Sequence, residues 1–188
     1  MPDLLEFEEP IGLLLKEIEA LAALEPSEDR DREIARLESR VGAMRADLYR
    51  TLHRFGFASR PQSTSRDDGL KLLDCRITNS VKCVPPQNKP MPAEIRACNR
   101  YLTAELSRRP MPPVLLALGS IAHNAALRAL ALKPSEYRFA HAAEHELPTG
   151  QILVNSYHCS RYNTQTRRLT EQMFVDVFAR ARKLLDGR

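Results

Sequence analysis

The sequence predicts an α/β fold in which helices cover a mainly parallel β-sheet. Strand-like and helix-like patterns alternate through the later part of the chain, which is typical of strands joined by helical crossovers. Val114 to Leu118 is a continuous apolar run that ends at Gly119, as expected for a parallel strand buried on both faces. The chain has 188 residues and a hydrophobic fraction of 43%, which is enough for one domain with its own core.

Residues 1–52 predict a helical hairpin. Pro10 suits the first turn of a helix, and Ser27 can cap the start of a second helix after the break at Pro26. Apolar residues recur at helical spacing in both helices. They are Ile11, Leu14, Ile18 and Leu21 in the first helix, and Ile34, Leu37, Val41, Met44 and Leu48 in the second. The simplest interpretation is a packing element.

Alternating strands and helices are predicted after a polar loop over residues 56–69. Ile77 and Val81 are the strongest β-formers of the first strand. Pro134 stops the predicted helix that ends at Leu132. The predicted strands are Leu70–Cys83, Val114–Leu118 and Gln151–Tyr157, and the predicted helices are Pro92–Leu106, Ile121–Leu132 and Thr170–Leu185.

Charge divides the chain near residue 52. Residues 1–52 hold 13 acidic and 7 basic side chains, a net charge of −6, whereas residues 53–188 hold 11 and 21, a net charge of +10. A basic region behind an acidic one indicates a nucleic-acid-binding domain over residues 53–188 with a separate leader. The alternative is an arginine-rich surface that is only solvated.

The composition predicts a cytoplasmic protein. No apolar run reaches membrane-spanning length, and the acidic start MPDLLEFEEP lacks the basic residues that open a signal peptide. The four cysteines are then expected to be thiols or metal ligands rather than disulfides.

Two loops beyond the carboxyl ends of predicted strands are the candidate functional sites, because ligands bind there in parallel sheets. The first runs from Asn79 to Pro86, and the second begins at His158. Polar side chains that could hydrogen-bond to phosphates or bases follow the histidine. They are Ser160, Arg161, Tyr162, Asn163 and Thr164. Alternatively, Asn79 only ends a strand and the second loop only grips phosphate.

Three segments resemble blocks of the type-4 and type-5 uracil-DNA glycosylases, in the same order and spacing. They are ITNSVKCVPPQNKPMPAEIRAC, LALGSIAHNAAL and SYHCSRYNTQTRRLT, and the SRYNTQT portion favours type 5. The resemblance covers the chain from about Leu48 to the C-terminus. It implies a uracil-DNA glycosylase-like α/β/α sandwich, N-terminally truncated and preceded by the helical hairpin, and a role in base-excision repair.

The resemblance also implies roles for single residues. Asn79 would pair its amide with the edge of a flipped uracil, since an amide presents one donor and one acceptor side by side. His158 would donate a hydrogen bond to uracil O2 while the N-glycosidic bond breaks and negative charge develops on the base. The loop from Ser160 to Thr166 would enter the minor groove of uracil-containing DNA and hold the base out of the stack.

Cys83 and Cys98 would, by the same resemblance, be two of four thiolate ligands to a [4Fe–4S] cluster. The other pair lies N-terminal in that family, whereas no cysteine precedes Cys75 in this chain. If they share one strand, Cys75 and Cys83 lie about 26 Å apart at roughly 3.3 Å per residue, which is too far for one cluster. Cys159 lies beside the candidate histidine. We therefore expect an incomplete cluster or none.

The first quarter of the chain departs from that family. Its type-5 members begin with a cysteine pair, a first strand and a glycine-rich loop with a stacking phenylalanine, and none of these is recognisable before Leu48. Residues 1–52 instead resemble the helical N-terminus of the acetyl-CoA carboxylase carboxyltransferase alpha subunit. Three functions stay open. They are a uracil-DNA glycosylase whose catalysis the missing motif would weaken or abolish, a non-catalytic DNA-binding module, and a subunit-interaction protein related to that carboxylase, with oligomers formed through the hairpin.

Overall fold

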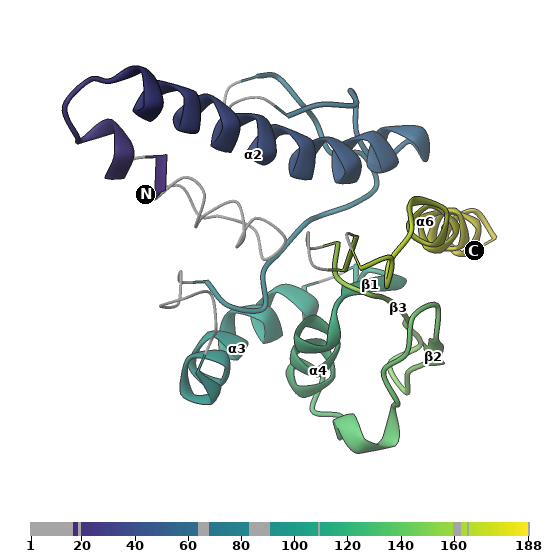
Figure 1. Cartoon of the computed structure of the whole chain (residues 1–188). Helices are drawn as coiled ribbons and strands as arrows, with labels where there is room; N and C mark the ends of the chain where they lie inside the picture. The colour runs from purple at the N-terminus through teal and green to yellow at the C-terminus, as the bar shows by residue number, and fades with distance from the viewer. Residues whose placement is uncertain are drawn as a thin grey trace.

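The computed structural model describes residues 17, 18, 20–63, 68–82, 91–108, 110–159, 163, 164 and 166–187, with residues 38–47 described by their backbone alone. A small mixed sheet lies between helices that cover both of its faces (Figure 1). This arrangement confirms the predicted α/β class.

Three strands form the described sheet, in the order β1-β3-β2. β1 (Val114–Leu118) runs parallel to β3 (Ile152–Ser156), and the two are in register along all five residues. β2 (Glu144–Glu146) pairs antiparallel with the other edge of β3. Because β3 is the central strand, residues 153–156 are all buried, whereas Ala117 alone is buried in β1.

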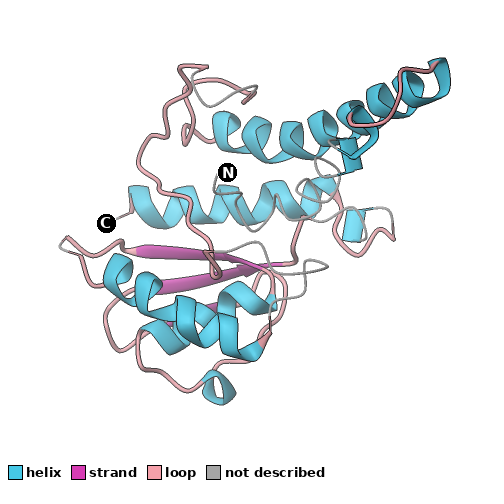
Figure 2. Ribbon diagram, turned by 90° about the vertical axis from the view of Figure 1, so that its left-hand side faces the viewer, coloured by secondary structure: helices cyan, strands magenta, loops and turns pink. Residues whose placement is uncertain are grey.

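Helices make the outer layers on both faces of the sheet (Figure 2). α3 (Pro92–Leu106) and α4 (Ser120–Ala129) pack together on one face of the sheet. α6 (Glu171–Asp186) lies on the other face, and α2 (Glu28–Arg54) contacts α6. A short 3-10 helix, η3 (Pro134–Glu136), follows α4. None of the helices in the described part of the chain is long and apolar enough to cross a membrane.

Apolar clusters hold these layers together. On one face, Leu48 and Leu52 of α2 and Phe178 of α6 are buried in the same cluster. On the other face, Leu102 of α3 packs with residues of α4, while Leu153 of β3 packs with α4 and β1. The sheet therefore has an apolar layer on each side, which is the usual requirement for a parallel pair of strands.

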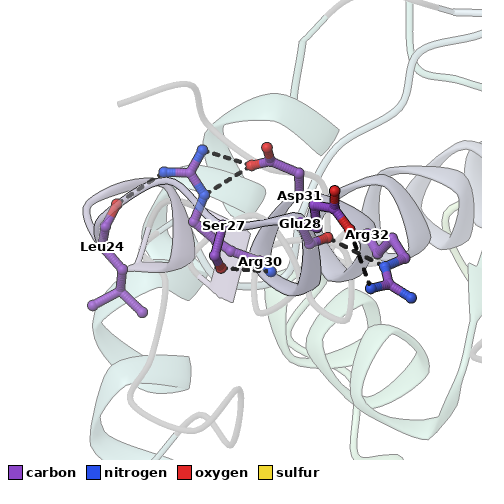
Figure 3. Close-up of polar contacts among 6 residues, drawn as sticks. All are labelled: Leu24, Ser27, Glu28, Arg30, Asp31 and Arg32. Carbon is purple, nitrogen blue, oxygen red and sulfur yellow. Dashed lines mark hydrogen bonds and ion pairs between the residues drawn. The ribbon is translucent and has the colours of Figure 1, made fainter.

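Local hydrogen bonds fix the start of α2 (Figure 3). The Oγ of Ser27 accepts a hydrogen bond from the N–H of Arg30 at 3.2 Å, which confirms the predicted cap. The Arg30 guanidinium turns back to donate to the Leu24 carbonyl at 2.8 Å, and it pairs with Asp31 at 2.6 Å. The acidic first turn also suits the positive end of the helix dipole.

α2 runs through residue 52, where the leader was predicted to end. Residues 17, 18 and 20–22 are helical as well, and residues 23–27 separate them from α2. The last turns of α2 carry Leu52 into the cluster that α6 shares. The division of the chain into residues 1–52 and 53–188 stays a prediction.

One predicted strand is wrong. Residues 70–82 form no strand. Their β-type pairing in the described structure is an isolated antiparallel bridge between Leu72 and Ala58. Ile77 and Val81 favour extended backbone, but β-propensity creates a strand only where a neighbouring strand accepts its hydrogen bonds. No strand of the described structure pairs with them. Cys83, the predicted last residue of that strand, lies outside the described residues.

The remaining predicted elements after residue 90 are confirmed, and two short ones were not predicted. α3 and β1 have the predicted bounds, whereas α4, β3 and α6 differ by one to three residues. β2 is the tripeptide EHE, which has no apolar alternation to reveal it, and η3 is a single turn after Lys133.

Candidate functional site

A cavity of about 550 Å³ lies beside β1. Its walls are formed by β1, by residues 74–80, and by apolar side chains of α2, α3, α4 and α6. Asn79 and His158 both line it. Asn79 is buried, with 6% of its surface exposed, and His158 is half-buried. The structure thus brings together the two residues that were predicted from separate loops.

The position of His158 depends on Gly119, which follows β1. Gly119 has a φ of 104° and donates its N–H to the Ser156 carbonyl at 2.9 Å. A Cβ at this position would lie 3.3 Å from the Cβ of His158 and 3.7 Å from its Cδ2. Glycine therefore supplies both a backbone conformation that other residues rarely adopt and the space that the imidazole occupies.

Asn163 closes the loop that follows His158. Its side-chain amide donates to the His158 carbonyl at 2.8 Å, and its own carbonyl accepts from the N–H of Leu169 at 2.9 Å. Leu169 is buried in the cluster of α6, so the loop is tied to the core. Thr164 is exposed. The other predicted DNA-binding residues lie outside the described part of the chain: Ser160, Arg161 and Tyr162.

A buried polar group braces β3 from α4. His123 is 1% exposed, its Nδ1 lies 2.8 Å from Asn155 Oδ1, and its Nε2 lies 2.9 Å from the Tyr137 carbonyl. Within the described structure the Asn155 Nδ2 is buried without a hydrogen-bond partner. Turning that amide over would let Nδ2 donate to His123 Nδ1 while His123 Nε2–H donates to the Tyr137 carbonyl.

A second histidine supports the residue just before His158. The Nδ1 of His141 accepts a hydrogen bond from the backbone N–H of Tyr157 at 3.1 Å, and the two rings lie 5.1 Å apart. Burial lowers the pKa of His141 from its ordinary value, although a hydrogen bond to Met173 and the charge of Asp176 oppose the shift. The neutral form that can accept this bond is therefore favoured in the folded protein.

Side chains, rather than a strand partner, hold the segment around Asn79. Thr78 donates to Glu105 at 2.5 Å, and the Lys82 ammonium lies 2.6 Å from Thr78 and 3.0 Å from Glu105. Arg76 adds an ion pair to Glu105 at 3.6 Å. Glu105 belongs to α3, so one carboxylate ties the residues on both sides of Asn79 to that helix.

The pKa of Glu105 follows from these contacts. Burial disfavours its charged form, but the hydrogen bonds from Thr78 and Lys82 and the charges of Lys82 and Arg76 outweigh that penalty. The pKa therefore lies below its ordinary value, and the carboxylate is ionised at neutral pH.

The three described cysteines lie in different surroundings. Cys98 is buried, and its Sγ accepts from the N–H of Lys82 at 3.3 Å, which places it next to the segment that leads to Cys83. Cys75 instead donates to the Phe57 carbonyl, and burial raises the pKa of its thiol to about 11. The described residues contain no group of three or more metal-ligating side chains.

Because residues 70–82 are not a strand, the separation of about 26 Å expected for Cys75 and Cys83 along one strand does not apply. The roles of Cys83 and Cys98 stay a prediction.

Sequence reasoning missed Glu105, Gly119 and His141. Glu105 contacts Thr78 and Lys82, and His141 contacts Tyr157, across long separations in the sequence, so no local motif reveals either residue. Gly119 had a signal, since it ends a buried strand where a sharp turn into a helix is common. Its close approach to His158 could be seen only in the structure.

Comparisons with known proteins agree with this geometry. The model of the uracil DNA glycosylase superfamily matches residues 37–182. The chain is 46% identical over 139 residues to a type-5 uracil-DNA glycosylase of Thermus thermophilus, covering 74% of this chain and 63% of the relative. It is 41% identical to that of Mycobacterium tuberculosis (73% and 52%) and 33% identical to that of Pyrobaculum aerophilum (72% and 58%).

The chain therefore matches about half to three-fifths of the length of these curated relatives. The family match begins inside α2, at residue 37, and extends almost to the end of α6. It confirms the resemblance to uracil-DNA glycosylases, while the likeness of residues 1–52 to a carboxyltransferase stays a prediction. The chain belongs to the uracil DNA glycosylase superfamily.

Proposed function

We propose that this chain is a uracil-DNA glycosylase that hydrolyses the N-glycosidic bond of a uracil flipped out of DNA. The observation that carries the proposal is that Asn79 and His158 line one cavity. A flipped base needs a pocket that reads its edge and another group that stabilises the charge it carries away. The relatives named type-5 uracil-DNA glycosylases support this choice of substrate.

In the proposed reaction Asn79 reads the base. Its carboxamide accepts from uracil N3–H and donates to uracil O4, whereas cytosine presents the opposite pattern of donor and acceptor at this edge. Asn79 is held from both sides by the contacts of Glu105 with Thr78 and Lys82. A fixed amide discriminates better than a mobile one, because a wrong base leaves its buried groups without partners.

His158 is the proposed group that stabilises the leaving base. Negative charge grows on uracil as the bond breaks, and a positioned N–H donor on O2 lowers the energy of that state. Gly119 leaves room for the imidazole, and Asn163 fixes the His158 carbonyl. Removing one such donor slows comparable enzymes by about 100- to 1,000-fold.

The proposed DNA surface is the loop after His158. Arg167 and Arg168 are exposed there, and the Arg168 guanidinium stacks 4.8 Å above the Tyr157 ring. Cations of this kind contact phosphates and give binding that weakens as salt rises. We keep non-catalytic DNA binding as the second candidate, because the charge of residues 53–188 favours binding without saying anything about turnover.

A single-turnover excision assay on a duplex with one uracil tests the proposal. The wild type should release uracil, and His158→Ala should reduce the rate by about 100-fold or more. His145→Ala is the matched control, since His145 lies in β2, bonds the Arg138 carbonyl and does not line the cavity. A rate that His158→Ala leaves unchanged would contradict the role of this residue. Salt-sensitive binding without release of uracil would favour the second candidate.

A further inference from the structure

The backbone ladder of β3 ends just before His158. Ser156 is the last residue of β3, and its carbonyl accepts the N–H of Gly119 at 2.9 Å. The next N–H along the chain belongs to Tyr157, and it donates to the Nδ1 of His141 at 3.1 Å. The first backbone hydrogen bond beyond the strand, directly before His158, is therefore made to a titratable side chain.

The backbone beside His141 fixes where that side chain lies. The next residue, Ala142, donates its N–H to the Asn155 carbonyl of β3 at 2.8 Å, which anchors the segment alongside the strand. Ala142 has a φ of 60°, a left-handed conformation that is uncommon for a residue with a side chain. Such conformations cluster at functional sites, and this one holds His141 next to Tyr157.

His141 also contacts the far end of the loop that carries His158. A hydrogen bond joins it to the backbone of Met173, in the first turn of α6, the helix that follows this loop. Because Nδ1 accepts from Tyr157, the proton of the neutral ring is on Nε2, which is the nitrogen left to donate to Met173. One imidazole thus joins the start of the loop to the helix at its end.

The ring of Tyr157 connects His141 to the proposed DNA surface. The two rings lie 5.1 Å apart with their planes inclined by 31°, and the Arg168 guanidinium lies 4.8 Å from the same Tyr157 ring. Within the loop, Asn163 donates to the His158 carbonyl at 2.8 Å. The loop is therefore held at both ends by contacts of His141 and internally by Asn163.

We propose that His141 is a positioning residue for His158, which holds the loop only while its own ring is neutral. This inference rests on the proposed role of His158 in excision. A protonated imidazole has donors on both nitrogens and no acceptor, so protonation breaks the hydrogen bond from the Tyr157 N–H. The start of the loop then moves, and His158 loses the alignment on which stabilisation of the leaving base depends.

The surroundings of His141 keep its ring neutral at neutral pH. Burial lowers its pKa from 6.5, and the opposing charge of Asp176 on α6 does not overcome that effect. The cation of Arg168 is stacked one ring away, and Glu144 of β2 is engaged by Arg180. The positioning form therefore predominates at pH 6.5 and above, and it is lost as the pH falls below that value.

Single-turnover excision by two variants tests the proposal. His141→Asn keeps an acceptor near the position of Nδ1 and does not titrate, whereas His141→Phe keeps a ring and has no acceptor. At pH 7 and saturating DNA, His141→Asn should excise uracil at close to the wild-type rate, and His141→Phe should be about tenfold slower or more. His145→Asn is the matched control, since His145 bonds the Arg138 carbonyl and does not contact the loop, and its rate should equal that of the wild type.

The pH profile separates positioning from a purely structural role. Between pH 7 and pH 5 the wild-type rate should fall relative to that of His141→Asn, toward the level of His141→Phe, because the other titrating groups are the same in all three proteins. Well below the melting temperature, a purely structural role would leave the ratio of wild type to His141→Asn constant. A constant ratio would overturn the proposal, and so would a His141→Phe rate equal to that of the wild type.

An NMR pH titration of the free chain distinguishes failure of this proposal from failure of the proposed function. The backbone amide signals of Tyr157 and His158 should show a transition at the pKa of the His141 imidazole, and that transition should be absent in His141→Asn. Amide signals without it would overturn the proposal, whether or not the chain excises uracil and whether or not His141→Phe folds. The transition in a chain that excises no uracil would contradict the proposed function and support the coupling of His141 to His158.

Discussion

The two segments that bring Asn79 and His158 to the cavity are held in different ways. His158 follows β3, which is paired on both edges and braced by His123 and His141. Asn79 lies in a segment without strand pairing, and Glu105 holds it through neighbouring side chains. Many backbone hydrogen bonds stabilise β3, so no single side chain is essential there. The segment around Asn79 depends instead on the one carboxylate of Glu105. Each side should therefore fail through a different kind of substitution.

The largest effect is expected for Gly119→Ala, which changes the backbone that positions His158. The substitution forces an L-residue into a φ of 104° and pushes its Cβ against His158. We expect a loss of about 1–3 kcal/mol in the free energy of unfolding and, if the proposed activity holds, a fall of about 100-fold in the excision rate.

Gly150→Ala is the control for this substitution. Gly150 has a φ of 82°, but a Cβ there meets nothing within 4 Å. Urea unfolding should show a similar loss of stability in both variants, while excision should fall only in Gly119→Ala. Equal excision rates in the two variants would mean that Gly119 does not position His158.

Glu105→Ala should have the next largest effect, on the Asn79 side. It removes hydrogen bonds to Thr78 and Lys82 and leaves charges without their partner, which should lower the free energy of unfolding by about 2 kcal/mol. The Glu105 contribution should also disappear in acid. Because its folded pKa is lowered, that stability is present above the ordinary value of 4.5 and is lost as the pH falls below it.

Glu144→Ala sharpens the comparison. Glu144 of β2 makes a bidentate ion pair with Arg180 of α6, at 2.7 and 2.9 Å, on the side of the sheet that has its full ladder. The pair is partly exposed, so its loss should lower the free energy of unfolding less than the loss of Glu105 does. Chemical denaturation of both variants measures the difference. A larger loss in Glu144→Ala than in Glu105→Ala would contradict the contrast between the two sides.

The smallest effect is expected from pH on the His141 contact. Burial lowers the pKa of His141, so the neutral ring stabilises the fold above its ordinary value of 6.5, and this stability is lost as the pH falls below 6.5. In His141→Phe the acceptor for the Tyr157 N–H is missing at every pH. The melting temperature of the wild type should therefore fall more than that of the variant between pH 7 and pH 5. Parallel curves would show that His141 does not contribute in this way.

Much of the fold could be predicted from the sequence wherever local pattern and tertiary partners agree. The run Val114–Leu118 and the Pro-initiated helix from Pro92 have the predicted bounds, because apolar spacing and turn residues determined both. Residues 70–82 have equally good β-formers, yet they are not a strand, because pairing depends on a neighbour that the local pattern does not reveal.

The residues of the candidate site differ in the same way, because some stand in local motifs and others depend on tertiary contacts. Asn79 and His158 could be predicted because they stand in motifs of contiguous residues. Glu105 and Gly119 could not, since their importance comes from contacts with Thr78 and His158 across the fold. Asn163 was predicted as a DNA contact, and its bond to the His158 carbonyl adds a positioning contact that its motif does not show.

The central claim is that Asn79 and His158 face one ligand, and NMR titration with free uracil tests it directly. This measurement does not depend on turnover, so it is informative even if catalysis is lost. Uracil should shift the side-chain amide signals of Asn79 and the imidazole signals of His158 together, with one binding constant, and cytosine should shift neither at the same concentration. Shifts at only one of the two residues, or equal shifts with cytosine, would contradict a shared uracil site.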